Sequence, residues 1–206
     1  PEYVSKLKSC GVSYLDSATE VVPAALHYLG KPPFSKNPAD YTAAANVLKA
    51  VRPYITVFSS SGYINDMANG SICVALGWSG DVNIARQRAI DGKTGNNIQA
   101  LIPKNGGLLF FDVMVIPADA SHPGNAHKFI NYLMEPEVIA KCTNDTNYAN
   151  VNLAANKFVD PAILADPAVY PDDELKKRLW TQKSMSSDLE RARTRAWSTI
   201  KTGSPS

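Results

Sequence analysis

Short apolar runs alternate with amphipathic stretches along the chain, and this alternation predicts an α/β fold with a mainly parallel sheet. Residues 12–15 predict a first strand, and the helix after it begins at Asp16 or Ser17 and stops at Gly30. A second helix is expected over residues 41–51, where apolar side chains recur at helical spacing. The chain is therefore expected to open with a strand and two helices.

The same patterns continue over the rest of the chain. Further strands are expected at 57–58, 72–78, 98–102 and 108–116, and further helices at 63–68, 81–90, 122–133, 136–141, 172–180 and 187–202. The continuous apolar run at 72–78 suits a strand buried on both faces. A Pro-Lys-Asn-Gly-Gly turn joins two of the later strands, and 157–173 has the composition of a loop with short turns.

Composition is that of an ordinary globular protein and excludes some functions. The 206 residues are 45% hydrophobic and 19% charged, enough for one large domain or two small ones. A net charge of +2 gives no basic field to hold nucleic acid, and no apolar run approaches the roughly 20 residues of a membrane span. Because the chain begins Pro-Glu-Tyr-Val, we interpret Pro1 as an interior position of a longer precursor, with a mature N-terminus as the alternative.

The cysteines and histidines do not form a metal-binding pattern. Cys10, Cys73 and Cys142 lack CxxC spacing and the chain has three His, so we expect neither a metal site nor a cofactor. Cys10 follows a basic helix end, and Cys73 lies within an apolar run. Both could be buried free thiols, or they could form a disulfide in an oxidising compartment.

Two runs pair an aromatic ring with a carboxylate. Residues 77–81 read Gly-Trp-Ser-Gly-Asp, and 110–112 read Phe-Phe-Asp. An aromatic face attracts an organic cation, and a carboxylate accepts the protons of its ammonium group. Trp78 and Asp81 follow a predicted strand, which is where open α/β sheets bind ligands. Alternation along the later strand puts Phe110 and Asp112 on one face, so the runs predict a site for a small organic cation.

Each candidate also has an ordinary structural interpretation. Trp78 could be a core residue and Asp81 a helix cap, while Asp112 could be a buried carboxylate paired with an arginine or with backbone amides. Three more residues join the candidate site only because of the two runs: Glu20 at a helix N-terminus, Ser60 in a serine cap and Tyr148 in a polar loop. The sequence contains no GxSxG, Walker or HExxH motif, so we expect a binding protein and not an enzyme.

At these runs the chain resembles the periplasmic polyamine-binding proteins of ABC transporters, particularly their putrescine-binding branch. The resemblance extends from end to end and rests on KLKSCGVS at 6–13, YLGK at 28–31, YIND at 63–66, GWSGD at 77–81, FFDV at 110–113, FINYL at 129–133 and RARTRAW at 191–197. It implies the type II two-lobe α/β fold, incomplete at its N-terminal side. Residues 1–87 and 158–206 would form the second lobe, and 88–157 the hinge-crossing part of the first.

The resemblance also implies a ligand site and partners. Its binding residues correspond to Glu20, Ser60, Trp78, Asp81, Phe110, Asp112 and Tyr148. It pairs Cys10 with Cys73 and leaves Cys142 free, and we expect that thiol to be buried. The expected partners are a polyamine (putrescine first, spermidine next), a membrane permease and the N-terminal part of the same protein, in the periplasm. The alternative is a related binding protein for agmatine, cadaverine or another cationic solute, or a sensory module.

Overall fold

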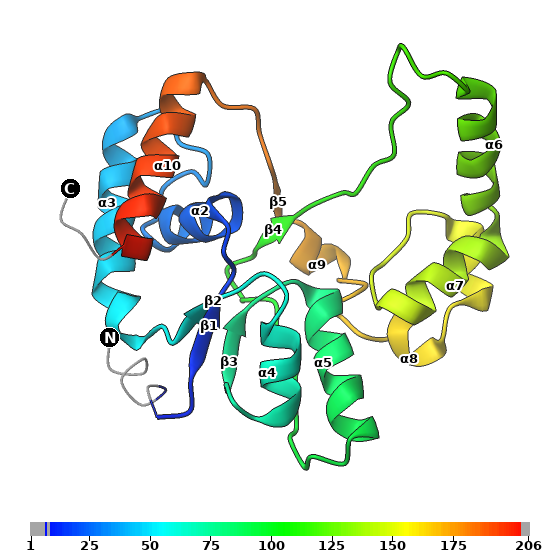
Figure 1. Cartoon of the computed structure of the whole chain (residues 1–206), viewed down its shortest axis with the longest axis horizontal. Coiled ribbons are helices and arrows are strands. Elements are labelled where there is room, and N and C mark those ends of the chain that lie inside the picture. The colour runs from blue at the N-terminus through cyan, green and yellow to red at the C-terminus, as the bar shows by residue number, and fades with distance from the viewer. Residues whose placement is uncertain (1–6, 8, 203–206) are drawn as a thin grey trace.

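Helices surround two small sheets in the structure (Figure 1). The computed structural model describes residue 7 and residues 9–202. The strands are β1 (Val12–Tyr14), β2 (Val57–Phe58), β3 (Val74–Leu76), β4 (Leu108–Leu109) and β5 (Trp180–Thr181). The helices are α2 (Ala18–Tyr28), α3 (Pro38–Val51), α4 (Tyr63–Asn69), α5 (Ser79–Asp91), α6 (Pro123–Leu133), α7 (Pro136–Thr146), α8 (Pro161–Leu164), α9 (Asp173–Lys176) and α10 (Ser187–Thr202), with 3-10 turns at Arg52–Tyr54 and Leu153–Phe158.

The larger sheet has the order β2-β1-β3, and both of its pairings are parallel. In register, Ser13 of β1 lies between Val57 and Ala75 and is fully buried. The chain moves from β1 to one neighbour and then across to the other. Because parallel crossovers are right-handed, the two connections lie on opposite faces of the sheet. Figure 1 accordingly shows α2, α3 and α10 to one side of the sheet and α4 and α5 to the other.

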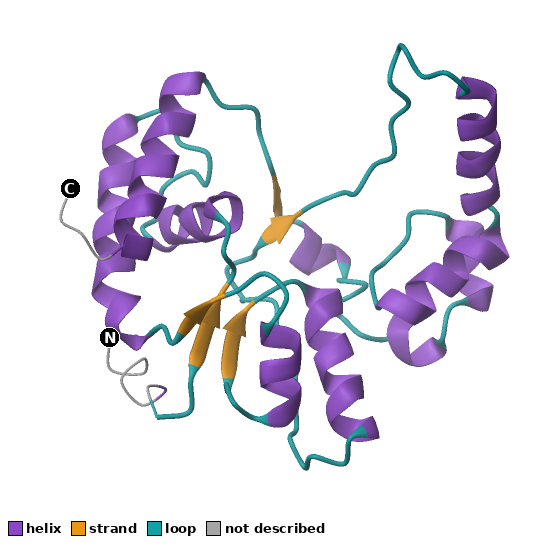
Figure 2. Cartoon of the chain, viewed as in Figure 1, coloured by secondary structure: helices purple, strands orange, loops and turns teal. Residues whose placement is uncertain are grey.

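Two hydrophobic clusters lie in different parts of the molecule. The larger one joins the sheet to the surrounding helices and includes Leu15, Leu26, Tyr63 and Ile200, all at most 1% exposed. A smaller cluster forms around Ala140 and packs α7 against the turn Leu153–Phe158 and α8. In Figure 2 a long loop, residues 110–122, leads from β4 to α6.

The structure confirms the α/β class, the parallel sheet and most of the predicted helices. Helix α10 spans the residues expected for it. Helix α3 starts earlier than expected because the Asn37 side chain accepts a hydrogen bond from the amide of Ala39. Helix α7 runs on to Thr146, beyond the predicted end at residue 141. Helix α9 is shorter than the predicted helix at 172–180, whose end instead forms β5 and pairs with β4.

Three strand predictions were wrong, in whole or in part. Residues 98–102 form no strand, and only Leu108–Leu109 of the run 108–116 does so, in a parallel pair with Trp180–Thr181. The apolar side chains beyond β4 are exposed, with Val113 at 77% and Val115 at 79%. A strand needs a neighbour for its backbone groups, and these residues have none in the described part of the chain. The third is the strand of 72–78, which is not buried on both faces, since β3 is at the sheet edge and Val74 is 37% exposed.

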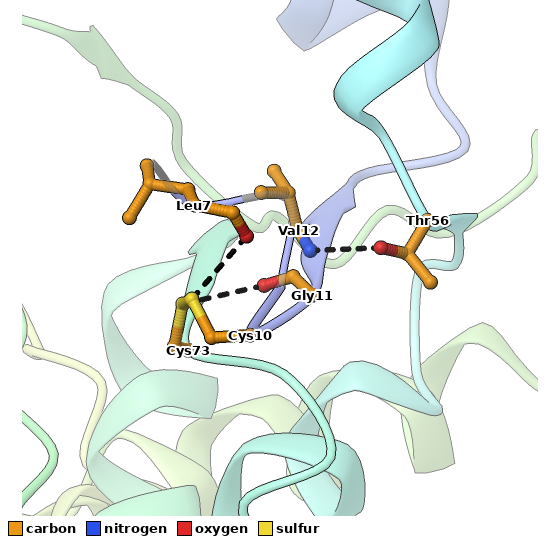
Figure 3. Close-up of a disulfide and its surroundings, with 6 residues drawn as sticks. All are labelled: Leu7, Cys10, Gly11, Val12, Thr56 and Cys73. Carbon is orange, nitrogen blue, oxygen red and sulfur yellow. Dashed lines mark hydrogen bonds between the residues drawn. A yellow bond between two sulfur atoms is a disulfide. The ribbon is translucent and has the colours of Figure 1, made fainter. Parts of the chain in front are cut away.

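Cys10 and Cys73 form a disulfide, so they are not buried free thiols (Figure 3). Their Cα atoms are 5.4 Å apart, within the usual range. The bond ties the start of β1 to the start of β3, beside the hydrogen bond of 3.1 Å from the Val12 amide to the Thr56 hydroxyl. Cys142 is free as expected, but it is half-buried and not buried. Most of the basic helix end expected before Cys10 lies outside the described residues.

We expect Cys10→Ala to reduce the free energy of unfolding by about 4 kcal/mol, the chain-entropy value for a sequence separation of 63 residues. Urea unfolding of the parent and variant measures the loss. Cys142→Ala is the matched control and should cause a much smaller change, because that thiol closes no loop. Equal midpoints for Cys10→Ala and the non-reduced parent would contradict the expectation.

Candidate ligand-binding site

Three of the predicted site residues follow the carboxyl ends of adjacent parallel strands. Glu20 lies in the first turn of the helix after β1, Ser60 in the loop after β2, and Trp78 directly before the helix after β3. Parallel pairing brings all three strand ends to the same edge of the sheet. The Ser60 hydroxyl accepts a hydrogen bond of 3.2 Å from the amide of Asp16, joining two of these loops. This edge is where α/β sheets bind ligands.

Glu20 is a half-buried carboxylate at the N-terminus of α2. It accepts a hydrogen bond from the hydroxyl of Ser17, the residue that precedes the helix. Burial raises the pKa of Glu20, while its own backbone amide and the charge of Arg193 act in the opposite direction. Glu20 therefore has the local hydrogen-bond partner that is usual for an acidic residue at a helix N-terminus. It also lies at the same edge of the sheet as the other candidate residues.

Asp81, in the first turn of α5, is held by two tyrosine hydroxyls. Tyr63 donates a hydrogen bond of 2.8 Å to one carboxylate oxygen, and Tyr148 donates one of 2.8 Å to the other. Tyr63 comes from α4, whereas Tyr148 comes from the loop after α7. Burial is the largest cause that raises the pKa of both tyrosines well above the ordinary value, and Asp81 raises both further. Both phenols therefore stay protonated and able to donate.

The glycines of the Gly-Trp-Ser-Gly-Asp run make room for these tyrosine rings. A Cβ atom on Gly77 would lie 2.6 Å from the ring of Tyr63, and one on Gly80 would collide with the ring of Tyr148. The backbone can approach the two rings this closely only without a side chain. The Trp78 amide also donates a hydrogen bond of 3.1 Å to the Tyr63 hydroxyl. The run thus places both rings against the turn that carries Trp78 and Asp81.

The second aromatic–acid run approaches the same group of residues. The ring of Phe110 makes an edge contact with the ring of Tyr148, with centroids 6.1 Å apart. The charge of Asp112 adds to the causes that raise the pKa of Tyr148. Asp112 is exposed, so its interpretation as a buried paired carboxylate is wrong. Since residues 110–112 form no strand, alternation does not decide which way their side chains point.

Tyr63 is the site residue that the sequence did not reveal. It is 0% exposed and lies at the first position of α4, so its ring has the burial of an ordinary core residue. It occurs in the YIND stretch of the resemblance, but its contact with Asp81 spans residues separated by 18 positions. A local sequence pattern does not indicate such a contact.

Carboxylates and aromatic rings of this kind suit an organic cation. Within residues 7 and 9–202, no group of three or more His, Cys, Asp or Glu could hold a metal ion. No helix in that described part is long and apolar enough to cross a membrane.

Solved structures define the class of this fold. The chain superposes with a TM-score of 0.85 on a putative spermidine/putrescine ABC transporter protein from Listeria monocytogenes, at 26% identity, covering 97% of this chain and 60% of that one. A substrate-binding protein from Streptococcus pneumoniae shares the fold with a TM-score of 0.78 at 24% identity, covering 98% of this chain and 62% of that one. The fold is that of the type II periplasmic solute-binding proteins.

Residues 2–171 match the family of bacterial extracellular solute-binding proteins, and the chain belongs to this family. It is 47% identical over 203 residues to the putrescine-binding periplasmic protein SpuD of Pseudomonas aeruginosa. It is also 47% identical over 204 residues to the putrescine-binding periplasmic protein PotF of Escherichia coli. Each alignment covers 98% of this chain and 55% of the relative, so the chain spans about half the length of these relatives.

We expect Gly77→Ala to reduce the free energy of unfolding by about 1–3 kcal/mol, because the added methyl group collides with the buried ring of Tyr63. Gly124→Ala is the matched control: it also lies in a folded segment, but a Cβ there meets nothing within 4 Å. Denaturant unfolding should show a loss for the first variant and none for the second. Equal stability of the two variants would show that the space between the Gly77 backbone and the Tyr63 ring can hold a methyl group.

Glu20 should give the folded protein a pH-dependent stability. Because the pKa of Glu20 is raised on folding, the folded state binds the proton more tightly than the unfolded state. Stability from this group is therefore lost as pH rises from the ordinary range of a glutamate through the raised pKa. Glu20→Gln removes the titration. As pH rises across this window, the unfolding free energy of the parent should therefore fall relative to that of the variant. A parent-minus-variant difference independent of pH would contradict the shift.

Proposed function

We propose that the chain is part of a periplasmic receptor that captures a polyamine, putrescine first and spermidine next, and delivers it to the permease of an ABC transporter. The observation that carries the proposal is the Asp81 carboxylate, fixed by two phenols and adjoining the aromatic residue Trp78. A polyamine combines ammonium groups with apolar methylenes, and this arrangement suits both. The names of the relatives, which are putrescine-binding or spermidine/putrescine-binding proteins, support it.

The charges of the candidate site match those of a diamine. An alkyl amine resembles the lysine side chain, whose pKa is about 10.4, so the ligand enters as a dication. Glu20, Asp81 and Asp112 would share its charges, and Ser60 would accept a further hydrogen bond. The rings of Trp78, Phe110 and Tyr148 would cover the methylenes and the ammonium ends, where a cation gains from the aromatic face. We infer a binding role and not a catalytic one, as the family membership suggests.

We further propose that 1–87 with 158–206 forms one lobe and 88–157 part of the other, completed by an N-terminal part of the same protein. Residues 1–6, 8 and 203–206 lie outside the described part. Two separate hydrophobic clusters support a division into two parts, although they do not follow these bounds: Ile98 packs in the larger cluster, and Val159, Ile163, Leu164 and Tyr170 belong to or pack against the smaller one. The exposed apolar run beyond β4 supports a missing neighbour, because an N-terminal strand beside it would bury these side chains.

A second candidate ligand is another cationic solute. The chain is 42% identical to a putrescine/agmatine-binding protein and 31% identical to a putrescine/cadaverine-binding protein, both of Pseudomonas aeruginosa. Agmatine and cadaverine carry the same paired cationic ends with a different head group or length. Carboxylates and aromatic rings alone do not distinguish these ligands, so their relative affinities must be measured.

Isothermal titration calorimetry tests the proposal on the polypeptide that includes its N-terminal part. We expect tight binding of putrescine, with spermidine, agmatine, cadaverine and free amino acids as competitors. Strongest binding of agmatine or cadaverine would favour the second candidate. No heat with any amine would contradict the receptor function. The chain of 206 residues alone provides a control and should bind more weakly, because it would carry part of the cleft.

We expect Asp81→Asn and Asp112→Asn each to weaken putrescine binding by about 1.5–3 kcal/mol, the contribution of a hydrogen bond to a charged group. Calorimetry measures both constants in the same buffer. Asp119→Asn is the matched control, an exposed carboxylate outside the candidate site, and should leave the affinity unchanged. Parent affinity in both site variants would remove these two residues from the site.

A further inference from the structure

We propose that Tyr63 is a positioning residue that fixes the ligand carboxylate Asp81 and the turn of Trp78 as one unit before the ligand arrives. The inference rests on the proposed function and adds to it a residue that does not itself touch the ligand. Tyr63 is 0% exposed, whereas Trp78 and Asp81 are partly exposed at the strand edge. It therefore acts from behind the site.

The hydroxyl of Tyr63 joins both functional groups. It donates to the Asp81 carboxylate at 2.8 Å and accepts from the Trp78 amide at 3.1 Å. One bond orients the group that would take the ammonium protons, and the other holds the backbone of the residue whose ring would cover the ligand. A single buried oxygen thus sets the relative position of the charge and the aromatic face.

The ring of Tyr63 has little freedom to move. It packs in the larger hydrophobic cluster and lies against the Gly77 backbone, which has no Cβ to push it away. Helices α4 and α5, which carry Tyr63 and Asp81, pack directly on each other. A carboxylate held by a fixed donor loses less conformational entropy when the ligand binds, so binding is tighter for the same contacts.

The second phenol on Asp81 differs from the first. Tyr148 is half-buried and comes from the loop after α7, a distant part of the chain. The Asp81–Tyr148 bond depends on how that loop lies against α5, whereas the Asp81–Tyr63 bond lies within one packed unit. A carboxylate has about four lone-pair sites, so two phenols leave room for an ammonium group. We infer that Tyr63 donates to Asp81 at all times, whereas donation by Tyr148 depends on the position of the loop after α7.

The test is a double-mutant cycle in the polypeptide with its N-terminal part, titrated with putrescine by calorimetry. Tyr63→Phe removes the hydroxyl and keeps the ring, and we expect the affinity to fall about tenfold. In the Asp81→Asn background the same change should cause a clearly smaller loss, because the carboxylate that Tyr63 orients is already altered and only its bond to the Trp78 amide remains to be lost. A merely structural role would give the same loss in both backgrounds.

Tyr41→Phe is the matched control. Tyr41 is also buried, at 2% exposed, and its hydroxyl donates a hydrogen bond of 2.9 Å to the carbonyl of Ser35, away from Asp81. Tyr41→Phe should reduce stability without changing putrescine affinity. Circular dichroism checks that each variant is folded. If Tyr63→Phe melts below the assay temperature, the whole cycle is repeated at a lower temperature at which every variant is folded.

The outcomes separate this inference from the proposed function. If the parent protein binds no amine, the receptor function fails. If the parent binds putrescine and Tyr63→Phe binds equally well, or loses the same factor in both backgrounds, the positioning role is overturned and the receptor function stands.

Discussion

The parallel pairing of β1 between β2 and β3 is the constraint on which the site depends. The paired segments are short, and Ser13 lies opposite Val57 on one side and Ala75 on the other. They nevertheless bring three strand ends to one edge of the sheet. The helices that follow those strands then carry Glu20 and Asp81 in their first turns. The disulfide between Cys10 and Cys73 closes the opposite, amino-terminal end of two of the strands.

A partly buried carboxylate must be compensated, and in the proposed site the compensation would leave it able to accept a cation. Two neutral phenols take part of the hydrogen-bonding capacity of Asp81 without neutralising its charge. A lysine or arginine in the same place would have satisfied the carboxylate but would also repel a cationic ligand. Asp166, in contrast, is paired with Arg86 at 3.1 Å and so serves a structural contact between α5 and the segment after α8.

Local sequence rules were reliable where one short segment decides its own structure. The apolar periodicity of residues 187–202 predicted the helix found there. Local rules failed for residues 98–102 and 110–116, since a strand forms only with a partner, and β-branched composition says nothing about whether one is near. The same limit applies to Tyr63, whose hydroxyl meets Asp81 only because α4 and α5 pack together.

The sequence by itself determined the α/β class, the two aromatic–acid runs and the resemblance to solute-binding proteins, because these depend on residue order and spacing. Only the tertiary structure decided that Phe110 meets Tyr148 and that two tyrosines hold Asp81. It also decided that Asp112 is exposed. These facts depend on which distant segments pack together, and packing is a property of the whole folded chain and not of any local pattern.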